Sequence, residues 1–342
     1  MRNASLLAAG GILANNRANA FAAEQSVSQQ SNRKSYGLQT YSLSNEIYQG
    51  NLGDNMKRIY NMGYNYLELA GYNQQNGTIG QVPMADFKKA ASDAGLEIRC
   101  SHLSPRVQGA YSNENRAEIA EFWKKAADDH AKIGVKMLVQ PSMPSSRNIP
   151  EVKLVCEIFN EAGRLSKAAG LSWGYHNHSN EFAWISPDST NYQLTQRAPR
   201  PAQTGGAAPG GGQQRPAAQA GAAPGGQQQP QQSPYVQIMT EYINNTDPTL
   251  VFIELDVYWA VMGFQDPLDW MRKYPNRILA LHVKDKEVLG QSGMMNFEQI
   301  FKQAYANNIE HFFVELEGMP PGTLFEGVKG CADYLNAAPF VK

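Results

Sequence analysis

The sequence lacks most of the features that mark specialised classes of protein. Its 342 residues include three cysteines and no C-x-x-C pair, which excludes a closed disulfide framework. We expect Cys100, Cys156 and Cys331 to be small buried side chains, although a single bridge between two of them stays open. The formal net charge is −1 and no basic stripe is present, so no nucleic-acid partner is expected. No run is apolar enough to span a membrane.

The first 23 residues are typical of a secretory signal peptide. Arg2 precedes an apolar run over residues 5–14, and small-residue cleavage sites follow at residues 18–22. The apolar run is too short to cross a bilayer as a helix. We therefore predict a signal peptide over residues 1–23, a disordered polar leader over residues 24–34, and export to a bacterial periplasm.

After the leader, strand-like apolar runs alternate with helix-like segments. The strands are expected at residues 36–43, 64–70, 96–103, 135–140, 171–177, 250–256, 277–284 and 311–317. Four of the helical segments end at a glycine, which takes the left-handed conformation that stops a helix. Eight strand–helix repeats over residues 35–340 predict a (β/α)8 TIM barrel. A doubly wound open sheet is the alternative, but no glycine-rich phosphate turn follows Gly37.

One segment interrupts this alternation. Residues 198–232 consist almost entirely of proline, glycine, glutamine and alanine. A segment without large apolar side chains cannot offset the entropy that it loses on folding. We predict a disordered insertion between the fifth strand and the fifth helix of the barrel.

Histidines and acids gather at the carboxyl ends of the predicted strands. They are Glu68, His102, His176, His178, Asp256, His282, Glu315 and Glu317. The strand ends of a parallel barrel form one rim, where its chemistry takes place. Charged and imidazole groups cost free energy in a barrel mouth unless they are paired or bind a ligand. The pattern therefore predicts a functional site on this rim.

The string YHNHSNEF at residues 175–182 carries the strongest local signal. In a strand, His176 and His178 share one face because side chains alternate. An isolated pair of this kind is better interpreted as a solvated loop, but Asp256, His282 and Glu315 end neighbouring strands. We predict that His176, Asp256, His282 and Glu315 bind a divalent metal ion. The mixed nitrogen and oxygen ligands suit Mn²⁺, Zn²⁺, Co²⁺ or Fe²⁺ better than Ca²⁺.

Two further side chains share faces with these ligands. Glu254 alternates onto the face of Asp256 but one step deeper, where we expect a structural role. Lys284 shares the face of His282 and is a candidate to bind a substrate oxygen or an enolate. A solvated lysine is the competing interpretation.

Four strings together resemble the xylose isomerase-like TIM-barrel superfamily of sugar isomerases and epimerases. They are YHNHSNEF, ELDVYWAVMGFQDP, NRILALHVKD and VELEG, at strands five to eight. The resemblance implies a divalent metal, often Mn²⁺, held by Glu, Asp, His and Glu from these strands. Asp256, His282 and Glu315 match that pattern. The sequence departs from it at strand five, where His176 stands in place of the glutamate.

The resemblance also implies roles for other residues. Glu68 and His102 stand where the family places catalytic or substrate-binding groups, and Trp259 resembles a wall of the sugar pocket or, equally, a core aromatic residue. Glu181 is a candidate substitute for the missing glutamate. The predicted catalytic residues are Glu315, Glu68, His102 and Lys284. The predicted substrate-binding residues are His178, Glu181 and Trp259.

The implied chemistry is removal of a proton next to a sugar carbonyl. Export and the lack of an arginine cluster favour an unphosphorylated sugar. We predict a sugar isomerase or epimerase with Mn²⁺ as the first candidate metal. A lyase or hydratase acting on 3-keto-glycosides uses the same first step and is the alternative. The third hypothesis is a non-catalytic sugar-binding protein that contains a metal.

Overall fold

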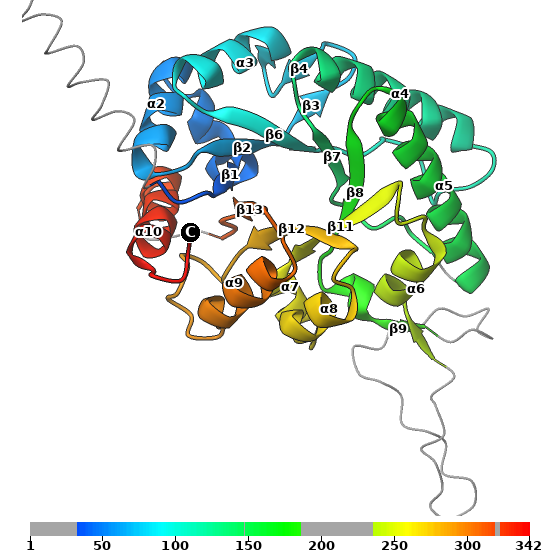
Figure 1. Cartoon of the computed structure of the whole chain (residues 1–342). Helices are drawn as coiled ribbons and strands as arrows, with labels where there is room; N and C mark the ends of the chain where they lie inside the picture. The colour runs from blue at the N-terminus through cyan, green and yellow to red at the C-terminus, as the bar shows by residue number, and fades with distance from the viewer. Residues whose placement is uncertain (1–32, 147, 186–234, 319–321) are drawn as a thin grey trace, which may run out of the picture.

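The computed structural model describes residues 33–146, 148–185, 235–318 and 322–342. Eight parallel strands in these ranges close into a barrel (Figure 1). In chain order they are β1 (Gly37–Gln39), β2 (Tyr66–Leu69), β6 (Glu97–His102), β7 (Met137–Gln140), β8 (Ser172–His176), β11 (Val251–Asp256), β12 (Ile278–Val283) and β13 (His311–Val314). They pair in the order β1-β13-β12-β11-β8-β7-β6-β2, and β2 pairs with β1 to close the ring. The predicted (β/α)8 TIM barrel is confirmed.

Helices surround the barrel on its outer side (Figure 1). The longer ones are α2 (Leu52–Met62), α3 (Met84–Asp93), α4 (Arg116–Lys132), α5 (Ile149–Ala168), α6 (Ile238–Asn245), α9 (Phe297–Ala306) and α10 (Leu324–Ala337). The shorter ones are η1 (Thr40–Tyr48), η2 (Asn180–Phe182), α7 (Val257–Met262) and α8 (Pro267–Lys273). Five short strands complete the described structure: β3 (Tyr72–Asn73), β4 (Thr78–Ile79), β5 (Val82–Pro83), β9 (Trp184–Ile185) and β10 (Val236–Gln237).

Several predictions concern residues outside the described ranges. The signal peptide over residues 1–23, the leader except for its last two residues, and the insertion over residues 198–232 stay predictions. Strands β9 and β10 pair antiparallel, with Ile185 opposite Val236. The described residues on either side of residues 186–234 therefore lie next to each other, directly before α6.

Local sequence accounts for where the helices begin and end. Asn51 and Asn148 each accept a hydrogen bond from a first-turn backbone N–H and so cap α2 and α5. Thr323 and Glu326 form a capping box at the start of α10. The four predicted terminal glycines follow α2 to α5 and have φ between 82° and 123°. These values confirm the glycine pattern that predicted the alternation.

The closed end of the barrel is filled by apolar side chains. The inward-facing set comprises Tyr66, Cys100, Met137, Val139, Phe252, Ala280 and Phe313. Two glycines make room for its rings: a Cβ on Gly37 would lie 2.2 Å from Tyr66, and one on Gly174 would lie 2.5 Å from Phe252. This packed floor leaves the carboxyl-terminal half of the interior to polar residues.

The structure also places the cysteines. All three cysteines are buried and free, as expected of small core side chains. Among the described residues, none of the helices is long and apolar enough to cross a membrane.

The chain departs from the prediction at both ends of the barrel sequence. The first strand was expected over residues 36–43, but it ends at Gln39 and a 3-10 helix, η1, follows. The last strand ends at Val314, so Glu315 and Glu317 lie in the loop beyond it. The sequence analysis also missed α7 and the hairpin strands β3 to β5.

Candidate active site

The polar residues predicted from the strand ends do meet at one mouth of the barrel. Six of the side chains lie at or near the carboxyl ends of β2, β6, β8, β11 and β12. They are Glu68, His102, His176, Glu254, Asp256 and His282. Lys284 and Glu315 follow β12 and β13 directly. All eight side chains are buried. Such a concentration of buried titratable groups must be paired, protonated or bound to a cation.

The four residues predicted to bind a metal lie together. His176, Asp256, His282 and Glu315 each offer one ligand atom, and these atoms all lie within 4.8 Å of one another. Two imidazole nitrogens and two carboxylate oxygens suit a transition-metal ion. The geometry fits the predicted ligand set, and the ion itself remains a proposal.

Asp256 shows the clearest sign of an ion-binding position. Its Oδ1 accepts a hydrogen bond of 2.7 Å from the backbone N–H of Trp259 and so caps α7. Its Oδ2 is buried and has no hydrogen-bond partner within the described structure. Burial raises the pKa of Asp256 to about 7, against the opposing charges of Lys284 and His282. One oxygen is therefore fixed by the helix and the other is available to a cation.

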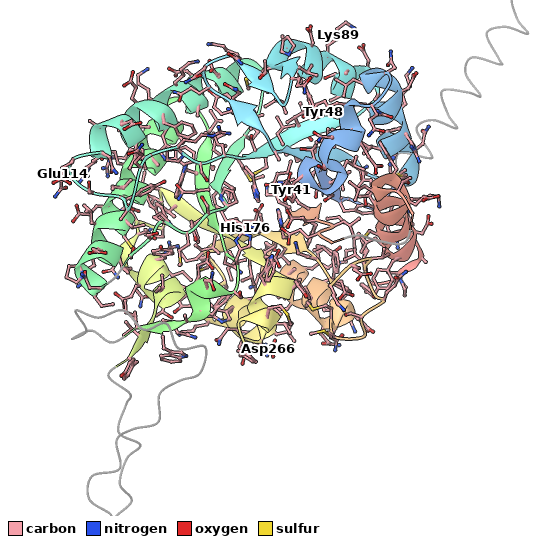
Figure 2. All side chains as sticks on the ribbon, turned by 180° about the vertical axis from the view of Figure 1, so that it is seen from behind. Tyr41, Tyr48, Lys89, Glu114, His176 and Asp266 are labelled. Atoms are coloured by element: carbon pink, nitrogen blue, oxygen red, sulfur yellow. The ribbon has the colours of Figure 1, made fainter. Side chains whose placement is uncertain are left out.

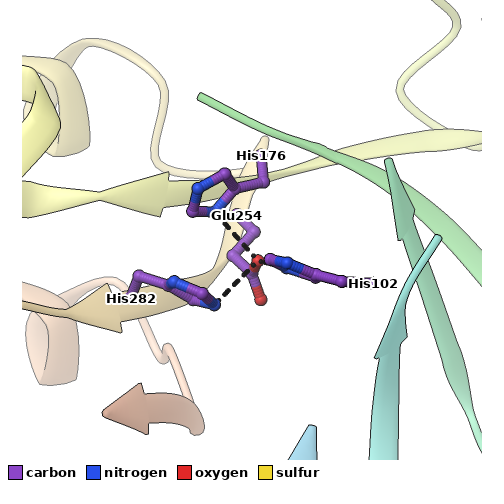
Figure 3. Close-up of side chains that lie close together, drawn as sticks. All are labelled: His102, His176, Glu254 and His282. Atoms are coloured by element: carbon purple, nitrogen blue, oxygen red, sulfur yellow. Dashed lines mark hydrogen bonds and ion pairs between the residues drawn. The ribbon is translucent and has the colours of Figure 1, made fainter. Parts of the chain in front are cut away.

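A second group of four side chains, drawn in Figure 3, shares His176 and His282 with the first. His102, His176, Glu254 and His282 offer ligand atoms that also lie within 4.8 Å of one another. Glu254 Oε2 is 2.6 Å from His102 Nε2, 3.2 Å from His176 Nδ1 and 3.3 Å from His282 Nε2. Glu254, expected to be structural, thus stands at the centre of three imidazoles. Alternation along β11 was the only sequence signal for this position.

His282 joins the two groups because its ring nitrogens face different carboxylates. Nε2 lies 2.6 Å from Glu68 Oε2, and Nδ1 lies 3.4 Å from Glu315 Oε2. Burial would lower the pKa of His282, but Glu254, Glu68 and Glu315 outweigh burial and hold that pKa well above its usual value. The ring is therefore oriented from both sides by acids.

Glu68 is tied into the barrel wall. Its Oε2 also accepts a hydrogen bond of 2.8 Å from Gln39 Nε2, and its Oε1 lies 3.2 Å from His102 Nε2. Burial would raise the pKa of Glu68, but His102 and His282 outweigh it and hold the pKa below the usual range. Burial would likewise lower the pKa of His102, yet Glu68 and Glu254 raise it to about 9.

Lys284 is a buried ion-pair partner, which excludes the interpretation as a solvated lysine. Its Nζ lies 2.9 Å from Glu315 Oε2 and 2.6 Å from Glu317 Oε2. The ammonium also lies over the ring of Trp259, 5.4 Å from its centre. Burial would lower the pKa of Lys284, but the two glutamates and Asp256 raise it.

A cavity of about 450 Å³ opens above these residues. His102, His176, His178 and Glu315 line its inner part, and Tyr41 from η1 stands at its edge, 57% exposed. Figure 2 places Tyr41 and His176 near the middle of the barrel. The predicted substrate-binding residue His178 therefore faces the cavity.

The other two predicted substrate-binding residues lie further from it. The ring of Trp259 contacts that of His178, with 5.6 Å between the ring centres, but does not line the cavity. Glu181 is buried, and its oxygens accept hydrogen bonds from Tyr175 Oη (2.6 Å) and the backbone N–H of His178 (3.0 Å). Glu181 is not among the four residues whose ligand atoms lie together. Its hydrogen bonds instead fix the loop after β8.

Sequence reasoning missed several residues around the candidate site. They are Gln39, which donates to Glu68, and Tyr41, Tyr72 and Arg106, which line the cavity. Most of them lie on loops or on short elements, where no periodic pattern indicates which way a side chain points.

Comparison with solved structures identifies the family. A sugar phosphate isomerase/epimerase from Parabacteroides distasonis is 45% identical, with a TM-score of 0.75 over 90% of this chain and 100% of that one. The chain belongs to the sugar phosphate isomerase/epimerase family. A second member from P. distasonis is 43% identical, with a TM-score of 0.75, over 90% of this chain and 98% of that one. The predicted resemblance to xylose isomerase-like barrels is confirmed.

More distant structures share only the fold. The 3-keto-D-glucoside 4-epimerase of E. coli is 16% identical, with a TM-score of 0.58 over 88% of this chain and 97% of that one. No family model and no curated protein matches the sequence. Membership supports an enzyme of the sugar isomerase and epimerase kind, and the specific reaction follows as a proposal.

Proposed function

We propose that the protein is a divalent-metal-dependent sugar isomerase or epimerase that removes a proton next to the carbonyl of an unphosphorylated sugar. The observation that carries this proposal is the convergence of four buried ligands on one point. Among them, Asp256 presents an oxygen without a hydrogen-bond partner. A buried carboxylate oxygen without a hydrogen-bond donor is costly unless a cation lies beside it, so the site fits a metal ion.

His176, Asp256, His282 and Glu315 would hold the ion. Two nitrogens and two oxygens suit Mn²⁺, Zn²⁺, Co²⁺ or Fe²⁺, and Mn²⁺ is our first candidate. When bound, such an ion acts as a Lewis acid that makes the C–H bond next to a carbonyl more acidic.

Exposure to the cavity separates the candidate bases. Glu315 lines the cavity, whereas Glu68 is fully buried beneath it with its oxygens close to Gln39, His102 and His282. Burial would raise the pKa of Glu315, but His282 and Lys284 keep it below the usual range, so the carboxylate is ionised. Glu315 is therefore the better base, and Glu68 acts through the histidines.

His102 is suited to return a proton. It lines the cavity, and with a pKa of about 9 it is an imidazolium at neutral pH. It comes from β6 and Glu315 from the end of β13, and two strands, β1 and β2, separate β6 from β13 in the ring. An acid and a base on different sides of one cavity can move a proton between carbons or between faces, which supports isomerisation or epimerisation.

The charge around the cavity supports an unphosphorylated substrate. Arg106 is the one arginine among the cavity-lining residues that the structure describes, and Glu315 and Glu317 line the same cavity. Phosphate recognition commonly uses several cationic groups or a helix N-terminus. A single exposed guanidinium beside two carboxylates does not supply such a site.

A lyase or hydratase acting on 3-keto-glycosides is the second candidate. It begins with the same proton removal and then expels the group on the next carbon. His176, in place of the family glutamate, leaves one carboxylate fewer at strand five, and an elimination needs one strong base. The E. coli protein of the same fold is named for a 3-keto-D-glucoside. A non-catalytic metal-containing sugar-binding protein is the third candidate.

Incubation with sugars in deuterated water tests the proposal. An isomerase, epimerase or lyase exchanges one carbon-bound proton, whereas no exchange across ketoses, aldoses and 3-keto-glucosides would favour the sugar-binding protein. Release of the aglycone from a 3-keto-glucoside identifies the lyase. We also propose export, because residues 1–23 are typical of a signal peptide. Determining the N-terminus of the mature protein tests that part.

A further inference from the structure

A second cavity of about 350 Å³ adjoins the one above the candidate site. Tyr72, Ser104, Pro105 and Arg106 line both, so the two cavities share a wall. The second one, here termed the outer groove, runs between the β3–β4 turn, the loop after β6 and the helix α4. None of the residues to which we assign a role in the proposed reaction lines the outer groove.

The walls of the outer groove are fixed by contacts between elements. Figure 1 shows β3 and β4 beside α4. Tyr72 Oη donates a hydrogen bond of 2.8 Å to Asp129 Oδ2 on α4, and the rings of Tyr72 and Phe122 form a T-shaped pair with 6.3 Å between their centres. Gly80 N donates a hydrogen bond of 2.9 Å to Gly71 O and closes the hairpin at its base. These hydrogen bonds and ring contacts fix the elements that line the outer groove.

The groove combines side chains that suit a sugar. Gln74 and Gln75 supply amides, Glu118 and Glu121 supply carboxylates, and all four line the groove. Amides and carboxylates form directional hydrogen bonds with hydroxyl groups. Tyr72 and Phe122 add aromatic surface for the apolar face of a ring. Two carboxylates against the single guanidinium of Arg106 disfavour a phosphate.

We propose that the outer groove binds a second sugar, so that the substrate is a glycoside rather than a free monosaccharide. The inference rests on the proposed function for the position of the reacting sugar, which occupies the cavity above the candidate metal ligands. The glycosidic bond then crosses the shared wall at Ser104 and Arg106. The reacting sugar and its neighbour each have a cavity of their own.

The experiment compares matched substrates and matched variants. Each monosaccharide is paired with a disaccharide that carries the same residue, and 3-keto-glucose is paired with 3-keto-disaccharides. Glu121→Trp fills the groove with an indole. Asp128→Trp is the control, because Asp128 is exposed on α4, two turns from Glu121 and outside the groove. Deuterium exchange gives kcat/KM, and calorimetry with unoxidised disaccharides gives Kd.

The proposal expects the natural protein to favour the disaccharide of a pair by roughly tenfold or more in kcat/KM. Glu121→Trp should remove that preference and leave the monosaccharide rate within about twofold, while Asp128→Trp should keep it. Equal rates within every pair, or an equal loss on both members in Glu121→Trp, would overturn the outer groove as a sugar site.

Failure of the proposed reaction gives a different result. No exchange with any sugar rejects the proposed function, and calorimetry then decides the groove alone. Disaccharide binding that is roughly tenfold tighter than monosaccharide binding, and that is lost in Glu121→Trp, supports the groove. Equal binding of the two, or binding unchanged by the indole, rejects it.

Discussion

The Nε2 of His282 lies 2.6 Å from the carboxylate of Glu68, while the Nδ1 of the same ring faces Glu315 and Asp256. A histidine held in this way by a carboxylate has its ring direction set before a metal arrives. We therefore propose that Glu68 positions a ligand; its prediction as a catalytic residue is tested by the same variant.

The first prediction is that Glu68→Gln weakens metal binding. The amide keeps the shape but removes the charge that orients His282, so metal affinity should fall by about 10- to 100-fold. Titration of the metal-free protein with Mn²⁺ measures it. Glu97→Gln, an exposed change at the other end of a barrel strand, is the control. Unchanged affinity together with lost proton exchange would instead make Glu68 the base.

The second prediction is that Asp256→Asn loses the metal and keeps the fold. The amide oxygen still caps α7 at Trp259, but the charge on the unpartnered oxygen is gone. We expect metal content to fall to background, and the metal-free variant to melt above the metal-free natural protein at pH 8. The second effect arises because burial raises the pKa of Asp256 to about 7, so ionisation destabilises the empty fold.

A matched control separates the metal from the cap. Asp266 caps α8 in the same way, accepting a hydrogen bond from Leu268 N, but its side chain is exposed. Asp266→Asn should leave metal content and melting temperature unchanged at pH 8. Elemental analysis and thermal melts measure both variants. Full metal content in Asp256→Asn would remove Asp256 from the ligand set.

Local rules were enough to predict the barrel. The strand β11 ends at Asp256 as expected, and the helices α2 to α5 end at the four predicted glycines. Each rule depends on near neighbours in sequence, such as a cap, a terminal glycine or an alternating run. The four proposed ligands followed because parallel strand ends must meet on one rim.

The errors have a different physical origin. After Gln39 the run TYSLSN alternates like a strand, but it turns into η1, where Ser44 has a φ of 44°. The central place of Glu254 and the binding of both Glu181 oxygens by Tyr175 and His178 depend on distances between separate elements. A one-dimensional pattern holds no such distances, so sequence could indicate the rim but not which acid faces which histidine.

The third prediction concerns Lys284. Its ammonium is the positive partner of Glu315 and Glu317, and the side chain is 1% exposed. Lys284→Met leaves Glu315 buried without this partner, which should lower the free energy of unfolding by about 3 kcal/mol. Urea unfolding measures the loss, and Lys286→Met, an exposed change two residues away, is the control. Equal stability of the two variants would show that the ion pairs contribute little.

Proton exchange in the same variant tests chemistry apart from stability. Without the ammonium, the Glu315 carboxylate loses a neighbouring positive charge and its pKa should rise. The acidic limb of the pH–rate profile should therefore move to higher pH in Lys284→Met and stay in place in Lys286→Met. An unshifted limb would separate Lys284 from the base.

The fourth prediction uses His130, a buried histidine away from the candidate site. Its Nδ1–H donates to the carbonyl of Ala126 (2.7 Å), and its Nε2 lies 3.0 Å from the hydroxyl oxygen of Ser101. Burial lowers the pKa of His130 to about 4, whereas the unfolded value is about 6.5. Between these values the unfolded chain binds a proton that the folded chain does not.

The free energy of unfolding should therefore fall as the pH drops from 6.5 to 4, by up to about 3 kcal/mol from His130 alone. Above pH 6.5 its contribution is constant. Urea unfolding of metal-free protein across this range measures the slope, and His130→Gln should reduce it. His311→Gln, at a partly exposed histidine, should change it less. The same slope in the natural protein and in His130→Gln would contradict the neutral, buried ring.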